Sequence, residues 1–376
     1  MKKAFNTIAE QIIYTACFFL TQAVLARSMP IEEFAKFSAF YSVVILLSII
    51  HNCTITEPVL IFIAKDHKPT TRSLALAHFP SAIFVIASAY YISPDTSKVA
   101  SLTYIATLLS FLIYWTNRSI AWQSGSIIKY SIPAILQAIC ITTLSLLGKA
   151  TLENTLFTIA ASLLIPLLII KKNNKPEHPL NLLASIKFSS LNLGAQVALW
   201  TMTHGLVIYY LQINEPDNSS KLRILLTLIL PAQYINIALS NYYLPILSKE
   251  PASSSNAIRF ITISAAISSA YGIILFSTGE KLASILFGRN FTSIDASNYF
   301  ILPIVLSAIQ STRTLLKSQQ ENLSIIISLS IGFVIFAILH LLTAQLEICA
   351  FIGLTSSATL LFLKTIHLIN THKERT

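Results

Sequence analysis

Residues 38–64 of the chain, SAFYSVVILLSIIHNCTITEPVLIFIA, are mostly apolar. A helix rises about 1.5 Å per residue, so roughly 20 such residues cross a hydrocarbon core of about 30 Å. Stretches of this kind recur along the whole sequence. The chain has 376 residues, of which 54% are hydrophobic and only 11% are charged, whereas an average soluble domain has roughly 25% charged residues. The sequence therefore predicts a polytopic helical membrane protein and disfavours a water-soluble fold.

We expect twelve membrane-spanning helices, because an open chain in lipid satisfies its backbone polar groups only as helices. A basic, proline-containing segment, KKNNKPEHP at 171–179, separates six spans from six. Transporters commonly pair two helical bundles around a central site. The sequence predicts an all-α protein of two six-helix bundles around a central cavity, over 1–170 and 186–376, with a cytoplasmic linker at 171–185. The expected spans are 7–26, 38–64, 74–92, 99–116, 130–147, 154–170, 186–211, 223–247, 258–278, 297–314, 323–342 and 345–365.

The distribution of Lys and Arg predicts the orientation, because cytoplasmic loops carry an excess of them. If the N-terminus is cytoplasmic, 18 of the 26 basic residues fall on the inner side and 8, among them Arg223, on the outer side. We therefore expect both termini in the cytoplasm. The net charge of +10 follows from the same excess and from anionic lipid, so no nucleic-acid partner is expected.

The first 26 residues resemble a secretory signal, with two lysines followed by an apolar stretch. Glu10, Gln11 and Gln22 interrupt that stretch, however. Counting the segment as a span also makes the charges of the later loops alternate. We therefore expect an uncleaved first helix.

Neither cysteines nor histidines form a pattern that holds a metal. The four cysteines lie within expected spans without CxxC spacing, and the eight histidines form no HExxH set. The chain also has no glycine-rich phosphate loop or dinucleotide fingerprint. We expect no cofactor.

Two fragments at the junctions of the fourth and fifth spans of each half are similar. TNRSIAWQSGS covers 116–126 and STRTLLKSQQE covers 311–321, which places Arg118 and Arg313 in matching positions at the inner ends of two spans. Chance is the alternative, because few residues are identical.

Polar residues recur at helical spacing inside four expected spans. Because charged and polar groups are costly at the bilayer centre, such stripes usually face a protein interior or a hydrated cavity. We interpret them as the lining of a cavity between the two halves, with helix–helix hydrogen bonding as the alternative for any single residue. The stripes are Asn6, Glu10 and Tyr14; Ser48, His51, Thr54 and Glu57; Asn192, Gln196, Trp200 and His204; and Gln233, Asn236, Ser240 and Asn241.

Glu57 is the most unusual member, because Pro58 follows it and favours a bend or opening of the helix there. We expect Glu57 to couple a proton to transport, with His204 and Glu10 as further candidates. The alternative for Glu57 is an ion pair with a buried cation such as Arg118 or Arg313. The alternative for Glu10 is contact with water, since it lies near the cytoplasmic end of its span.

Three segments together resemble a known family. LARSMPIEEFAKFSAFYSV at 25–43, NYYLPILSK at 241–249 and ILFGRNFTSIDA at 285–296 are similar to corresponding segments of polysaccharide and O-antigen exporters. These exporters belong to the multidrug, oligosaccharidyl-lipid and polysaccharide (MOP) exporter superfamily. The resemblance implies a flippase that moves an undecaprenyl-diphosphate-linked oligosaccharide, such as a lipopolysaccharide O-antigen unit, across the bacterial inner membrane. It also implies a polysaccharide polymerase and a chain-length regulator as partners, besides membrane lipids.

A lipid-linked sugar predicts roles for the polar residues. Arg118 and Arg313 are candidates to bind the diphosphate, because guanidinium groups bind phosphate in bidentate fashion. Their alternative role is that of cytoplasmic anchors. The substrate-binding cavity is expected to include Glu57, His51, Asn192, Gln196, Trp200, His204, Gln233 and Asn236.

Two other function classes stay open. A multidrug or cation antiporter of the same fold would use Glu10 or Glu57 to hold a cationic drug or a proton. A membrane-embedded polysaccharide polymerase or glycosyltransferase shares the composition, but such enzymes generally carry a large external catalytic loop. The longest external connection expected here has about 18 residues, at 279–296, so we expect a transporter and not an enzyme.

Overall fold

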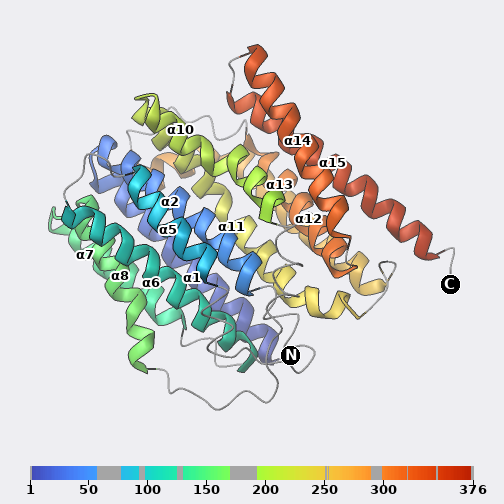
Figure 1. The fold of residues 1–376 in the computed structure, drawn as a ribbon, viewed down its shortest axis with the longest axis horizontal. Coiled ribbons are helices and arrows are strands. Elements are labelled where there is room, and N and C mark those ends of the chain that lie inside the picture. Colours follow the sequence, from blue (N-terminus) through green and yellow to red (C-terminus); the bar gives the residue numbers. More distant parts are fainter. Residues whose placement is uncertain are drawn as a thin grey trace. The chain divides into compact units, whose positions relative to one another are not determined.

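The computed structural model describes most of the chain as helix (Figure 1). The described residues form twelve α-helices and two π-helical segments, and no strand occurs among them. Each expected span overlaps one of these helical segments in the expected order, so the all-α fold class is confirmed. The described residues are 2–56, 78–92, 98–124, 130–169, 193–249, 252, 254–288, 299–319, 321–343 and 346–373.

In the part of the chain that the structure describes, six helices are long and apolar enough to cross a membrane. Three shorter apolar helices accompany them, at Phe79–Ser88, Ile132–Leu146 and Leu152–Ile165. The protein is therefore a multi-pass membrane protein. The six long spans are Ala9–Ser28, Ile31–Thr56, Pro216–Leu244, Ser255–Phe287, Asn322–Thr343 and Leu346–Thr371.

Helix α14 (Asn322–Thr343) illustrates how the sequence suits lipid. Its exposed face is a stripe of large apolar side chains at steps of three and four residues, which is one side of a helix. Its buried face combines small, polar and apolar side chains. Because lipid does not penalise exposed apolar side chains, this helix carries large apolar side chains on its exposed face as well as on its buried face. The exposed stripe is Leu323, Ile327, Ile331, Val334, Ile338 and Leu341.

The chain divides into two compact units. The first comprises residues 1–193 and 207–223, and the second residues 194–206 and 224–376. The predicted linker, 171–185, lies outside the described residues. Residues 207–223, which follow that linker in sequence, cluster with the first unit.

The first unit contains six helices of the N-terminal half, one further π-helical segment, and the turns around α10. Within it α1 packs on α7, α6 packs on α8, and α2 contacts both α5 and α6. The elements are α1 (Lys2–Ser28), α2 (Ile31–His51), η1 (Asn52–Thr56), α5 (Phe79–Ile92), α6 (Lys98–Ser124), α7 (Ile132–Leu146), α8 (Leu152–Ile169) and α10 (Leu206–Gln212).

Local sequence explains the ends of several of these helices. Pro30 precedes the first turn of α2, and Glu32 and Glu33 in that turn suit the positive end of the helix dipole. Helix α7 ends before Gly148, whose φ of 66° lies in the left-handed region that a glycine adopts without strain. In the second unit, helix α12 (Ser255–Phe287) begins after Ser254, which accepts a hydrogen bond from the Ala257 amide.

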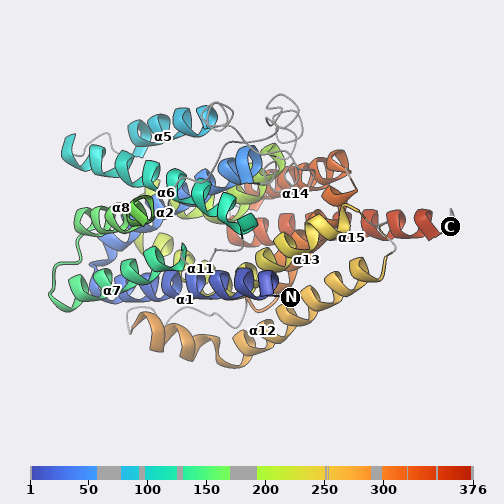
Figure 2. The same cartoon turned by 90° about the horizontal axis from the view of Figure 1, so that it is seen from below.

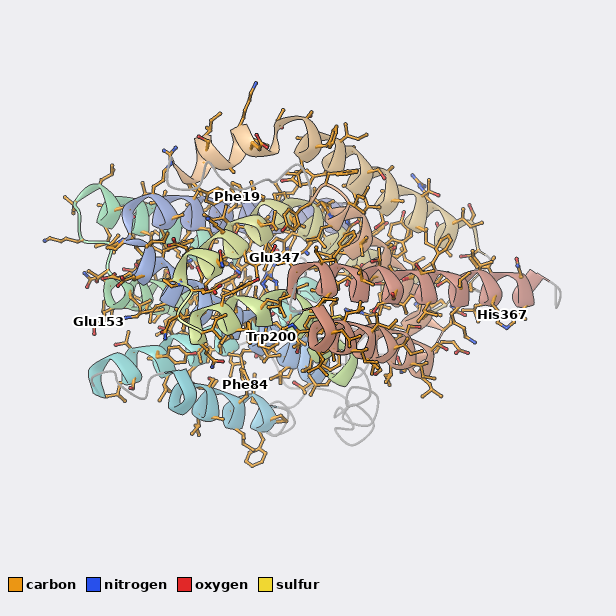
Figure 3. All side chains as sticks on the ribbon, turned by 90° about the horizontal axis from the view of Figure 1, so that it is seen from above. Phe19, Phe84, Glu153, Trp200, Glu347 and His367 are labelled. Atoms are coloured by element: carbon orange, nitrogen blue, oxygen red, sulfur yellow. The ribbon has the colours of Figure 1, made fainter. Side chains whose placement is uncertain are left out.

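The second unit contains η3 (Thr201–Gly205), most of α11 (Pro216–Leu247), α12 (Ser255–Phe287), α13 (Leu302–Ser318), α14 and α15 (Leu346–Lys373). Helices α14 and α15 lie side by side (Figures 1 and 2). Their closest approach is at Gly332 and Gly353, where an added methyl group would collide with the facing helix. Tyr299 donates a hydrogen bond of 2.5 Å to Glu347, which lies at the start of α15 and is labelled in Figure 3.

A compact apolar cluster joins α11, α12 and α13 of the second unit. Phe260 of α12 and Leu315 of α13 are fully buried in it, next to Leu247 at the end of α11. The Gln319 side chain, directly after α13, donates to the Leu247 carbonyl oxygen at 3.1 Å. This cluster fixes the end of α13 that carries Arg313.

Two π-helical segments occur in the spans that carry polar stripes. Segment η1 ends at Thr56, directly before the Glu57–Pro58 pair at which we expect the helix to open. Segment η3 begins directly after Trp200, which Figure 3 labels. A π-turn inserts an extra residue per turn and is frequent at functional sites. It therefore changes the direction of His204 relative to the regular spacing from which its stripe was predicted.

Candidate functional site

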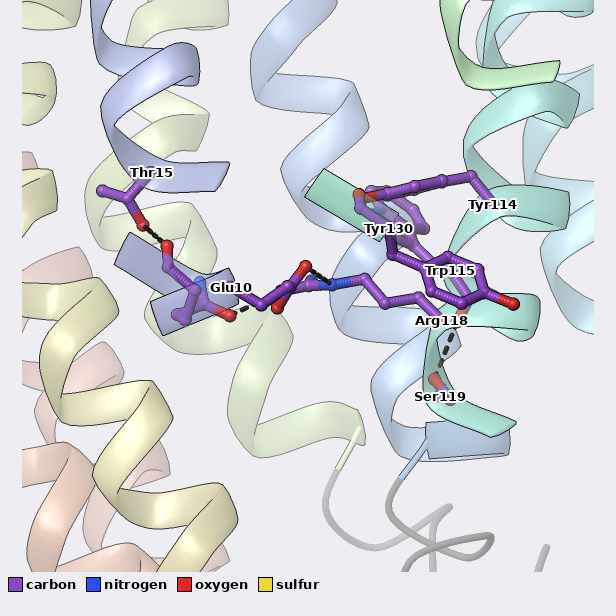
Figure 4. Close-up of polar contacts among 8 residues, drawn as sticks. Glu10, Thr15, Tyr114, Trp115, Arg118, Ser119 and Tyr130 are labelled. Carbon is purple, nitrogen blue, oxygen red and sulfur yellow. Dashed lines mark hydrogen bonds and ion pairs between the residues drawn. The ribbon is translucent and has the colours of Figure 1, made fainter. Parts of the chain in front are cut away.

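The most strongly connected polar group of the first unit joins α1 to α6 (Figure 4). Arg118 of α6 is buried and donates from Nε to Oε1 of Glu10 and from Nη2 to Oε2 of the same carboxylate, both at 2.8 Å. Glu10, on α1, is fully buried. Two parallel charge-assisted bonds of this kind fix the relative orientation of both groups.

Two neighbours on α1 hold the same guanidinium. Gln11 accepts a hydrogen bond from Nη2 of Arg118 through Oε1 at 2.6 Å. The Tyr14 ring lies under the guanidinium, with its centroid 4.7 Å from Cζ, a distance at which a cation and an aromatic face attract. The Tyr14 ring also stacks on Tyr114, whose hydroxyl donates to the Tyr130 carbonyl oxygen at 2.7 Å. The guanidinium is thus oriented by an amide and an aromatic face as well as by a carboxylate.

These contacts bear on the alternative roles that the sequence left open for Glu10, contact with water, and for Glu57, an ion pair with Arg118 or Arg313. Helical spacing places Glu10 and Tyr14 on one side of α1, and the structure brings both to Arg118. Glu10 does not contact water here, and it is Glu10 that pairs with Arg118. Glu57 lies outside the described residues, so its role stays a prediction.

A second polar group lies between α2, α5 and α6 of the first unit. The Nε2 atoms of His51 and His78 both contact the Thr116 hydroxyl, at 3.0 and 2.9 Å. The Nδ1 atom of His51 contacts the Thr56 hydroxyl at 3.2 Å, and Thr56 in turn contacts Ser119 at 2.9 Å. His51 is buried in this network, on the side of α2 that faces α6. Sequence analysis identified His51 but missed its partners, which lie in other parts of the chain.

Arg223 is a second buried cation of the first unit, and sequence analysis counted it among the outer basic residues. It is fully buried in α11. Its Nε donates to Gln22 of α1 at 3.3 Å, and its Cζ lies 4.0 Å from the ring centroid of Tyr41 on α2. Its place as the first residue of an expected span did not reveal this burial, which depends on residues of two other helices.

Arg313 of the second unit differs from Arg118 in its surroundings. It lies on α13 and is only 7% exposed. Its Nε atom is buried without a hydrogen-bond partner among the described residues. Lys317 follows one helical turn later on the same side of α13 and is also buried. Two basic side chains therefore lie close in sequence within the interior of this unit.

Asn236 is tied into a network between α11, α12 and α13. Its side chain donates to Ser268 at 2.8 Å and accepts from Ser264 at 2.6 Å. Ser264 also contacts Ser307 at 3.0 Å. These are contacts of the helix–helix kind named above as the alternative to a cavity-lining role, and a role for Asn236 in sugar binding stays a prediction.

The other expected cavity residues are placed as follows. Gln196 and His204 are buried, whereas Trp200 and Gln233 are partly buried. Asn192 lies outside the described residues. Among the described parts of the chain, no three His, Cys, Asp or Glu side chains gather closely enough to hold a metal ion.

No protein-family model matches the sequence, and no curated protein is similar to it. Solved structures are similar over nearly the whole chain. A MOP superfamily transporter from Pyrococcus furiosus, whose binding pocket is described as reversed in polarity and indicative of a different function, aligns with a TM-score of 0.72. The sequence identity is 11%, and the alignment covers 99% of this chain and 96% of that one.

Two conformations of a multidrug resistance MATE family transporter of the same superfamily are also similar. The outward-facing form aligns with a TM-score of 0.69 at 13% identity, covering 99% of this chain and 96% of that one. The inward-facing form aligns with a TM-score of 0.64 at 12% identity, covering 97% and 96%. Identities of this size establish the fold alone. The chain has the fold of MOP superfamily transporters, and these neighbours are membrane transporters, not enzymes.

Proposed function

We propose that the protein is a flippase that moves a lipid-linked oligosaccharide across a bacterial inner membrane by alternating access. The substrate class is an undecaprenyl-diphosphate-linked repeat unit of a surface polysaccharide such as O-antigen. Two lines support the proposal, the first for a membrane transporter in general and the second for a polysaccharide exporter. The fold is that of MOP superfamily transporters, and the three segments at 25–43, 241–249 and 285–296 resemble polysaccharide exporters within that superfamily.

The observation that carries the proposal is the sign of the buried charge. Among the described residues, Glu10 is the only buried carboxylate, whereas four buried side chains are basic: Arg118, Arg223, Arg313 and Lys317. Burying a cation costs free energy unless an anion or hydrogen-bond acceptors compensate it. An excess of buried positive charge therefore suits an anionic substrate and disfavours a cationic drug.

Arg313 is the residue that we assign most directly to the diphosphate. A guanidinium has five N–H donors, and its Nε finds no acceptor among the described residues. A phosphate group would satisfy this donor and compensate the charge in bidentate fashion. Lys317, one turn away, would add a second positive charge. Arg118 is the second candidate, although Glu10 occupies its guanidinium in this structure.

The sugar and the cellular setting complete the proposal. Gln196, Gln233 and Asn236 supply amide groups, and Trp200 supplies an aromatic face, the chemistry with which proteins commonly bind sugars. The proposed orientation places both termini in the cytoplasm. A polymerase and a chain-length regulator would receive the exported unit on the outer side. The alternative, a multidrug antiporter of the same fold, would use Glu10 or Glu57 to hold the cation; Glu10 is paired with Arg118, and Glu57 lies outside the described residues.

Arg313→Ala and Arg313→Lys test this assignment. A charge-assisted hydrogen bond contributes about 1.5–3 kcal/mol, so Arg313→Ala should lower export roughly ten- to a hundredfold. Arg313→Lys keeps the charge but loses the bidentate geometry and should export at an intermediate rate. The measurement is the amount of surface polysaccharide on bacteria that lack their own exporter and express each variant at equal level.

Arg259→Ala is the matched control, since Arg259 is an exposed arginine on α12. It should export at the wild-type rate. Wild-type export by well-expressed Arg313→Ala would remove Arg313 from the substrate site.

A further inference from the structure

We infer that Glu10 is an exchangeable internal anion: it occupies the position on Arg118 that a substrate phosphate takes, and binding of that phosphate places one proton on Glu10. This inference rests on the proposed function, because it assigns the second phosphate-binding arginine to the substrate. It goes beyond that function by naming how substrate binding and proton uptake are linked.

The first step is the geometry of the pair. Glu10 contacts Nε and Nη2 of Arg118 through one oxygen each, both at 2.8 Å. A phosphate group can bind arginine through the same edge of the guanidinium, with two oxygens on two N–H groups. The carboxylate and a bidentate phosphate therefore exclude each other on this edge of Arg118.

The second step is that Arg118 does not depend on Glu10 alone for its position. The Gln11 amide oxygen accepts from Nη2 at 2.6 Å, and the Tyr14 face lies 4.7 Å from Cζ. Both neighbours are uncharged and lie on α1. When the carboxylate leaves, these two contacts keep the guanidinium oriented for the incoming phosphate.

The third step is the charge balance. Both oxygens of Glu10 contact Arg118, and no other polar partner of this carboxylate lies among the described residues. A displaced, ionised carboxylate would be a buried and unpaired charge, which is strongly unfavourable. Protonation of one carboxylate oxygen removes that charge. Arg118 keeps its proton and pairs with one negative charge of the phosphate, so the site is neutral before and after the exchange.

The other titratable groups at this site do not compete for the proton. Tyr14 faces Arg118 from α1, Tyr114 from α6, and Tyr130 lies directly before α7 next to Tyr114. Phenols are neutral at pH 7 and hold their proton throughout. Glu10 is therefore the group that takes up the proton.

The test uses the purified full-length protein in detergent and P1,P2-dimethyl diphosphate as the probe. Each phosphorus of this probe carries one ester and one charge at pH 7, so the probe itself exchanges no proton. Arg313→Ala is present in every arm, so that Arg118 is the phosphate-binding arginine measured. Calorimetric titrations in buffers of different ionisation enthalpy give the number of protons taken up for each probe molecule bound.

We expect uptake of about one proton per probe with Glu10 present and none in Glu10→Gln. Glu10→Gln should also bind the probe roughly tenfold more tightly, because the internal competitor is gone. Adding Arg118→Ala to Glu10→Gln should abolish that binding. Glu153→Gln, which changes an exposed carboxylate on α8, should behave like the parent protein.

Probe binding without proton uptake overturns the inference, as does a Glu10→Gln variant that binds no more tightly than the parent. Absence of binding in all arms overturns it as well. If Glu10→Gln does not fold, Glu10→Asp replaces it. The shorter carboxylate should pair less well with Arg118, so this variant should bind the probe more tightly than the parent protein. It should still take up one proton per probe molecule. If the oligosaccharide crosses vesicles but no proton accompanies the probe, the inference fails and the proposed function stands. If probe binding is linked to proton uptake but the oligosaccharide does not cross the vesicle membrane, the proposed function fails and the exchange between Glu10 and phosphate on Arg118 stands.

Discussion

His51 lies at the end of α2 and His78 directly before α5 of the first unit, and their ring centroids are 5.7 Å apart. The Thr116 hydroxyl lies between them and contacts both Nε2 atoms as well as the Leu112 carbonyl oxygen. One hydroxyl hydrogen serves only one acceptor, so at least one of the two imidazoles must donate its Nε2 hydrogen to Thr116. The threonine therefore selects a histidine tautomer.

The first prediction concerns this threonine. Thr116→Val keeps the shape but leaves both Nε2 atoms without their partner, which should destabilise the protein by about 1–3 kcal/mol. Thr116→Ser keeps the hydroxyl and should cost less than about 1 kcal/mol. Thermal unfolding of the purified protein in detergent measures the difference. Equal stability of the valine and serine variants would show that the hydroxyl is unimportant.

The second prediction concerns the contact between α14 and α15. A methyl group on Gly332 would fall on the Ser357 hydroxyl and the Gly353 carbonyl oxygen. Because backbone atoms cannot move aside as a flexible side chain does, Gly332→Ala should separate the two helices and lower stability by about 1–3 kcal/mol.

Gly194→Ala is the matched control for Gly332→Ala. A methyl group added at Gly194 meets nothing within 4 Å. This variant should therefore fold as well as the wild type in the same thermal unfolding measurement. A Gly332→Ala protein as stable as Gly194→Ala would contradict the packing described for these two helices.

The third prediction concerns orientation. Reporter fusions after Lys172, Lys249 and Lys317 should report the cytoplasm, and fusions after Ser97 and Arg289 the periplasm, because basic residues accumulate on the inner side. A reporter that is active only in one compartment measures this directly. A cytoplasmic signal after Arg289 would overturn the predicted topology.

Span positions and long-range contacts differ in how far the sequence predicts them. The number and order of the helices follow from apolar length, which is a local property of segments such as 38–64. Helical phase also placed Glu10 and Tyr14 correctly on one side of α1. The pairing of Glu10 with Arg118 joins residues 108 positions apart, and spacing within one helix carries no information about it.

The π-helical segments and the burial of Arg223 were missed for a related reason. Segment η3 interrupts the regular phase between Trp200 and His204, and a stripe drawn at four-residue steps assumes an uninterrupted helix. Arg223 was assigned to the outer side from its place at the edge of a span. Its burial depends on Gln22 and Tyr41, which come from two other helices.

The most direct test of the central claim is transbilayer movement of the substrate itself. Purified protein is reconstituted into vesicles that contain an undecaprenyl-diphosphate-linked oligosaccharide in both leaflets, and a membrane-impermeant reagent modifies the sugars exposed outside. With the wild-type protein, the modified share should rise beyond the outer-leaflet share and approach all of the substrate, whereas vesicles with Arg313→Ala should stay close to protein-free vesicles. A modified share that stays at the outer-leaflet level with folded wild-type protein, in vesicles that instead expel a cationic dye, would contradict the proposed flippase function.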